Sequence, residues 1–202
     1  MAAMTPAPRP RLSAQERKRW RRALSNWQTP DSMIGKADAL STLLGQAAPT
    51  QAGLEFFREA FVAGRFASAV GAEHVRLVHP DPRPDFELRT RGQVEAFELV
   101  EADTPGRRRG EAYAEPAAGP VSAPEAGWLT AEGAAAMLAT AAAKKADGRY
   151  DRGVRLLIHL NPTDHDAQQA EIETAMKPAT AAAANVFAEV WVFWKDRPYR
   201  VW

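Results

Sequence analysis

The spacing of apolar residues along the chain predicts a regular series of helices and strands. Positions three and four apart predict helices over residues 13–26, 33–44, 51–69, 130–146 and 161–184, with a break at Pro178. Alternating or continuous apolar runs predict strands over residues 74–79, 86–90, 94–102, 154–160 and 186–194. Thr29 and Pro30 are expected to end the first helix, and residues 199–202 to pair back on the last strand.

The order of these elements predicts an α/β fold. A helix, three strands, a helix, a strand, a helix and a strand form a sandwich whose central mixed β-sheet is flanked by helices. Residues 51–202 are expected to form this domain. Residues 1–50 are expected to form a basic, partly disordered N-terminal arm with short helices, the first beginning at a Ser13–Glu16 capping box. The Pro- and Gly-rich segment over residues 104–127 exceeds ordinary connections, which is typical of functional or disordered loops.

The composition excludes several classes of protein. The 202 residues can bury a core, and the lack of cysteine excludes a disulfide scaffold, a thiolate zinc site and a thiol nucleophile. Dinucleotide-binding, P-loop and Gly-x-Ser-x-Gly motifs are absent. No window approaches the roughly 18 apolar residues of a membrane span, and the start lacks a signal peptide's apolar segment. We therefore expect a soluble, cytoplasmic protein.

The net charge of +1 hides an asymmetry. Residues 1–22 carry a local charge of +6, which leaves −5 on the remaining 180 residues. A basic segment on an acidic body fits a polyanionic partner, because neutralised phosphates release counterions. We expect Arg17, Lys18 and Arg19 to bind nucleic acid, DNA rather than RNA. The alternatives are a solvated basic tail and an Arg-rich transit peptide.

Two acidic residues are placed to form a metal site. Asp85 follows Pro84 where a Pro-rich turn enters a strand, and Glu98 lies in the middle of the next strand. Phe97 and Leu99 point to one face of that strand and Glu98 to the other. If the two strands pair, the carboxylates can converge and offer the oxygen ligands that Mg²⁺ or Mn²⁺ takes. Such a metal activates water and stabilises charge on a phosphate.

Pro84-Asp85, Glu98 and the order of elements together resemble the PD-(D/E)XK nuclease superfamily. Its restriction-endonuclease-like core runs α-β-β-β-α-β, with Pro-Asp entering the second strand and Glu-x-Lys in the third. The resemblance covers roughly residues 51–195 and leaves the helical N-terminal extension outside. It implies a Mg²⁺- or Mn²⁺-dependent phosphodiesterase, a nuclease that acts on DNA in repair or processing.

The lysine of the third-strand motif is missing, because Val100 stands two residues after Glu98. The superfamily is known for moving this lysine to a neighbouring helix, where Lys144 and Lys145 are the substitutes. Lys145 follows Leu138 by seven residues, so its stem can run along apolar surface to a cleft. There a lysine can orient the attacking water or stabilise transition-state charge. The alternative is that both lysines are solvated and stabilise a helix C-terminus.

Further carboxylates extend the predicted site. Glu101 is an accessory metal ligand, or forms an alternative site with Asp103 on the same strand. Many superfamily members add a carboxylate from the first core helix, where Glu55 and Glu59 lie one turn apart. Glu59 is the preferred catalytic residue and Glu55 a metal ligand. Both are also ordinary partners of a helix N-terminus.

Three consecutive arginines follow the third strand. Arg107, Arg108 and Arg109 would contact phosphates at the mouth of the site, or form a solvated charge run. The histidines lack metal-ligand spacing. The alternative to a nuclease is a non-catalytic nucleic-acid-binding or assembly protein on a degenerate nuclease fold, which Val100 favours. A third interpretation is a structural α/β protein that binds another protein. The oligomeric state stays open.

Overall fold

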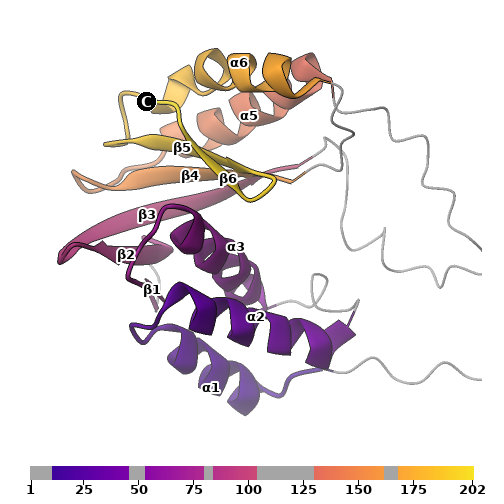
Figure 1. Ribbon diagram of the computed structural model, residues 1–202, viewed down its shortest axis with the longest axis vertical. Coiled ribbons are helices and arrows are strands. Elements are labelled where there is room, and N and C mark those ends of the chain that lie inside the picture. Colours follow the sequence, from indigo (N-terminus) through magenta and orange to yellow (C-terminus); the bar gives the residue numbers. More distant parts are fainter. Residues whose placement is uncertain (1–10, 46–52, 80–83, 104–129, 162–167) are drawn as a thin grey trace, which may run out of the picture.

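The computed structural model describes residues 11–45, 53–79, 84–103, 130–161 and 168–202 (Figure 1). Within these ranges six strands form one mixed sheet, and five α-helices lie on its two faces. The predicted α/β class, with a central mixed sheet flanked by helices, is confirmed. No helix in the described part of the chain is long and apolar enough to cross a membrane.

Local capping signals set most of the helix starts. The helices are α1 (Ala14–Leu24), α2 (Pro30–Leu44), α3 (Glu55–Ala69), α5 (Ala131–Ala146) and α6 (Gln169–Ala179), and a 3-10 turn η3 (Ala181–Ala183) follows. Ser13 and Glu16 form the predicted capping box of α1, and the Thr130 side chain caps α5. The expectation that Thr29 and Pro30 only end a helix is wrong. Thr29 caps α2 and Pro30 occupies its first turn, where a missing amide hydrogen loses no hydrogen bond.

The strands follow one another across the sheet in chain order. They are β1 (His74–Leu77), β2 (Phe86–Thr90), β3 (Gln93–Ala102), β4 (Arg155–Leu160), β5 (Val190–Trp194) and β6 (Arg197–Arg200). β1 to β3 form an antiparallel meander, β4 and β5 run parallel to β3, and β6 turns back antiparallel on β5. β5 starts later than predicted, because the amides of Val186 and Phe187 still bond to Ala183.

Two tight hairpins set the register of the antiparallel pairs. Arg91 and Gly92 join β2 to β3 with φ angles of 51° and 77°, and Lys195 and Asp196 join β5 to β6 with φ angles of 52° and 56°. Two consecutive positive φ angles are typical of the type I′ turn, whose twist matches that of the flanking strands. The first hairpin brings the start of β2 against the middle of β3.

The sheet separates two hydrophobic cores. On β3, Phe97 packs on the side of α1 to α3 and Val100 on the side of α5 and α6 (Figure 1). On β4, Leu157 and Ile158 divide between the same two cores. The continuous apolar run of β4 is therefore covered on both faces, as its sequence predicts.

Helices α1 and α2 belong to the first core, although the sequence assigns them to an arm. Their buried side chains are Leu24, Met33, Ala37, Leu40 and Leu44. Between the two helices, Gln28 exchanges two backbone hydrogen bonds with Val75 of β1, of 2.8 and 3.1 Å. This contact ties the N-terminal helices to the edge of the sheet. The first ten residues lie outside the described part of the chain.

Gly64 on α3 lies against α2. A Cβ atom there would lie 3.1 Å from Met33 Cγ and Ile34 Cγ1. We expect Gly64→Ala to lower the free energy of unfolding, measured in urea, by about 1–3 kcal/mol through overpacking. The control is Gly35→Ala on α2, whose Cβ would meet nothing within 4 Å. It should raise the free energy of unfolding by roughly 0.5–1 kcal/mol, because alanine favours helix. If Gly64→Ala and Gly35→Ala both raised the free energy of unfolding, the close packing of Gly64 against α2 would be contradicted.

Candidate active site

Three hydrogen bonds hold Asp85 at the start of β2. Its amide donates to the Phe97 carbonyl at 2.9 Å, and its carbonyl accepts from the Val78 amide at 3.0 Å. Its carboxylate Oδ2 accepts from the Leu99 amide at 2.6 Å. Strand amides point along the plane of the sheet, and the Leu99 amide directly follows Glu98. The Asp85 carboxylate therefore lies beside the backbone of Glu98.

Glu98 is buried against α5 and paired with a lysine. Its side chain points away from the face of Leu99, and the residue is only 2 % exposed. Lys145, in the last turn of α5, places its Nζ 2.6 Å from Glu98 Oε1. Lys144 is exposed, and Val100 is a core residue next to α5. Of the two lysines that the sequence offered, the structure brings Lys145 to the carboxylate.

Glu59 on α3 interacts electrostatically with Asp85. The pKa of Glu59 is raised from 4.5 to about 7, first by burial and then by the negative charges of Asp85 and Glu55. Arg58 and Arg21 act in the opposite direction. Glu59 on α3 thus lies within electrostatic range of Asp85 at the start of β2.

Glu101 lies on the other face of β3 from Glu98 and contacts two basic groups. Its carboxylate is 3.6 Å from Arg58 Nη1 and 3.8 Å from His159 Nδ1. Sequence patterns did not single out His159, because it faces Glu101 only through the parallel register of β3 and β4. Arg58, which lies on α3 between Glu55 and Glu59, is likewise part of no sequence motif. Glu55 is exposed, and its carboxylate accepts a hydrogen bond of 3.3 Å from an amide just before the helix.

The described carboxylates do not enclose a metal ion by themselves. In the described residues no three Asp, Glu or His side chains converge closely enough to enclose an ion. Mg²⁺ is often held through only one or two carboxylates, with waters and substrate phosphate completing its coordination. Asp85 and Glu59 can act in this way, since mutual repulsion contributes to the raised pKa of Glu59 and a cation would relieve it. Glu98 points to the opposite face of the sheet from α3, so the described structure does not gather its carboxylate into one cluster with Asp85 and Glu59.

The residues predicted to bind nucleic acid fall into two groups. Residues 107–109 lie outside the described part of the chain. On α1, Arg17 turns inward and donates to the Leu12 carbonyl at 2.7 Å. Lys18 and Arg19 are exposed to solvent.

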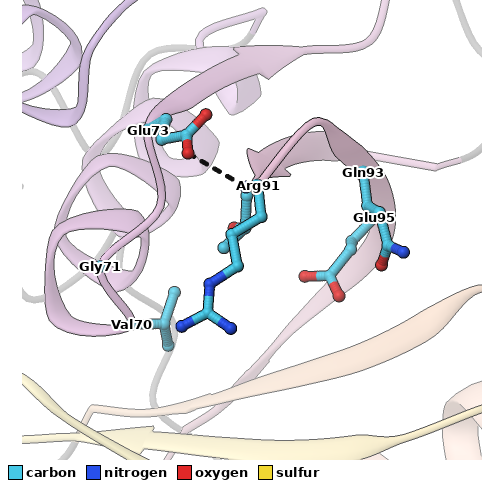
Figure 2. A pocket seen from close by; sticks show the side chains of 7 residues that line it. Val70, Gly71, Glu73, Arg91, Gln93 and Glu95 are labelled. Carbon is cyan, nitrogen blue, oxygen red and sulfur yellow. Dashed lines mark hydrogen bonds between the residues drawn. The ribbon is translucent and has the colours of Figure 1, made fainter.

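A separate hollow opens at the C-terminal end of α3. It has a volume of about 470 Å³ and lies between the turn after α3 and the β2–β3 hairpin (Figure 2). Figure 2 shows the Arg91 side chain reaching across it toward Val70, and the Arg91 amide donates to the Glu73 carboxylate at 3.1 Å. None of the predicted site residues lines this hollow. This hollow is therefore separate from the candidate site around Asp85.

No protein-family model matches the chain, and no curated protein or solved structure matches it either.

Proposed function

We propose that this protein is a metal-dependent phosphodiesterase that cleaves DNA at a restriction-endonuclease-like site. The run α3, β1, β2, β3, α5 and β4 supports this, because it repeats the α-β-β-β-α-β order of that fold. The proposal depends most on the 2.6 Å contact between Lys145 and Glu98, beside Asp85. It supplies a lysine at the Glu98 carboxylate although position 100 is a valine.

The acidic residues have distinct roles in this proposal. Asp85 and Glu59 would hold Mg²⁺ or Mn²⁺, whereas Glu98, which the sequence also offered as a ligand, points to the α5 face and pairs with Lys145. The bound ion would lower the pKa of its water and neutralise charge on the phosphate. The Leu99 amide already orients the Asp85 carboxylate. Because the pKa of Glu59 is about 7, cation binding there competes with a proton and should strengthen as the pH rises.

Lys145 would act on the phosphate. An ammonium group carries three donors, and the contact with Glu98 uses one of them. The others can point to a phosphate oxygen, where a positioned positive charge stabilises the transition state. The Lys145 side chain is only 18 % exposed. Reduced contact with water strengthens such an interaction.

The test is cleavage of single-stranded, duplex and branched DNA with Mg²⁺ or Mn²⁺. Asp85→Asn keeps an oxygen acceptor for the Leu99 amide but removes the charge, so cleavage should be lost. Lys145→Arg keeps the ion pair with Glu98 but moves the charge, so cleavage should slow. Lys144→Arg, at the exposed neighbouring position, is the matched control and should cleave like wild type. Wild-type rates in Asp85→Asn would refute the proposal.

A second candidate function is non-catalytic binding of nucleic acid on a degenerate nuclease fold. Val100 is buried in the core, and Lys145 neutralises Glu98, so this ion pair could serve stability alone. In that case DNA should bind without a divalent cation and be recovered uncut. Asp85→Asn should then bind as wild type does.

A further inference from the structure

The basic residues of α1 fall into two groups, one near the hydrophobic core and one facing away from it. Trp20 packs against the first core, so it marks the inner side of α1. At about 100° per residue, Arg17 and Arg21 lie next to this side. Lys18 and Arg22 lie one step further out, and together they form a continuous basic sector.

The inner pair fastens α1 to the start of α3. Arg21 donates to the Gly53 carbonyl at 3.2 Å, and its guanidinium lies 5.2 Å from the centre of the Phe56 ring. The Arg17 side chain lies 3.8 Å from where a Gly53 Cβ would be. The charge of Arg21 also acts on Glu59, one of the proposed metal ligands. The basic sector therefore begins at the start of α3, about one turn before Glu59.

The outer residues carry charge that the described part of the chain does not neutralise. Lys18, Arg19 and Arg22 are exposed, and no described carboxylate forms an ion pair with them. The nearest acid along the helix, Glu16, is engaged by Ser13 in the capping box at 2.7 Å. Uncompensated cations on one rigid helix face fit a partner with regularly spaced negative charges.

We infer that the outer face of α1, formed by Lys18, Arg19 and Arg22, binds the phosphate backbone of the nucleic acid whose phosphodiester reaches Asp85. The position of the reacting phosphate rests on the proposed function, whereas the electrostatic contact with α1 can be measured without cleavage. Arg17 and Arg21 hold the helix in place, so their role is to position this surface.

The experiment measures the affinity of the full chain for a duplex oligonucleotide in EDTA over a range of salt concentrations. Lys18→Gln/Arg22→Gln should reduce the slope of log K against log salt by about 2, because each lost phosphate contact contributes roughly 0.9. This reduction in slope corresponds to an affinity about 30-fold lower than that of the wild type at about 0.15 M salt. The matched control is Arg152→Gln/Lys195→Gln, which removes the same charge at exposed positions on other elements. It should leave the slope within about 0.5 of wild type.

Three outcomes separate this inference from the proposed function. An unchanged slope in Lys18→Gln/Arg22→Gln, or an equal loss in the control, would overturn the role of α1 even if wild type cleaves DNA. A reduced slope in a protein that never cleaves DNA would keep the role of α1 and reject the nuclease. Binding to phosphatidylserine vesicles but not to DNA would show that the basic face meets a membrane surface, and would also overturn the inference.

Discussion

Replacing Lys145 with methionine is expected to lower the free energy of unfolding by about 3–5 kcal/mol, because it removes the ammonium group that pairs with a buried carboxylate. Glu98 is 2 % exposed, and its Oε1 lies 2.6 Å from Lys145 Nζ. Methionine retains most of the apolar stem of lysine, so the change removes charge with little loss of packing. Urea unfolding followed by tryptophan fluorescence measures the difference.

Two further variants isolate the ion pair. Lys144→Met, at the exposed neighbouring position, should change the free energy of unfolding by less than about 0.5 kcal/mol. The double variant Glu98→Gln/Lys145→Met removes both charges and should recover much of the lost stability. Equal midpoints for Lys145→Met and wild type would show that Lys145 does not neutralise Glu98. The assignment of Lys145 to the site would then fail as well.

Glu59 is expected to make the protein less stable as the pH rises toward neutrality. Its pKa is about 7 in the folded chain against 4.5 for the free side chain, because burial and the charge of Asp85 disfavour its ionised form. The folded state therefore binds the proton more tightly. This contribution to stability is fully present below about pH 4.5 and is lost as the pH rises through about 7. In buffer without divalent cations it amounts to roughly 3 kcal/mol.

Glu59→Gln should remove this dependence. At about pH 8 the variant should be more stable than wild type by up to about 3 kcal/mol, and near pH 4 the two should be similar. Asp151→Asn, an exposed change outside the helices and strands, is the control and should shift stability by less than about 0.5 kcal/mol. Parallel pH profiles for Glu59→Gln and wild type would contradict the raised pKa of Glu59.

Short-range signals explain why the elements could be predicted. The capping box at Ser13 and the cap at Thr130 act within a single helical turn, and both are present. Thr29 and Pro30 are ambiguous in the sequence, because the same two residues can follow one helix and begin the next. The strand predicted from residue 186 starts late because its first residues complete the preceding turn.

Long-range contacts explain what could not be predicted about the site. The sequence does not show which of Lys144 and Lys145 reaches the site, because both are lysines in the last turn of the same helix. Only the packing of α5 on β3 brings Lys145 to Glu98 and leaves Lys144 exposed. His159 contacts Glu101 through strand register, which no local pattern reveals. The raised pKa of Glu59 likewise depends on its burial in the folded chain and on the charge of Asp85, which lies outside α3.

The sequence by itself determined the α/β class, the order of helices and strands, and the set of charged residues from which a site could be built. Periodicity, caps and turns act over a few residues, so they can be read locally. Only the tertiary structure decided which charges meet. Glu98 and Lys145 are 47 residues apart, and their contact exists because the sheet register and the packing of α5 bring them together. Burial makes this ion pair important for the stability of the fold, because a carboxylate removed from water needs a partner.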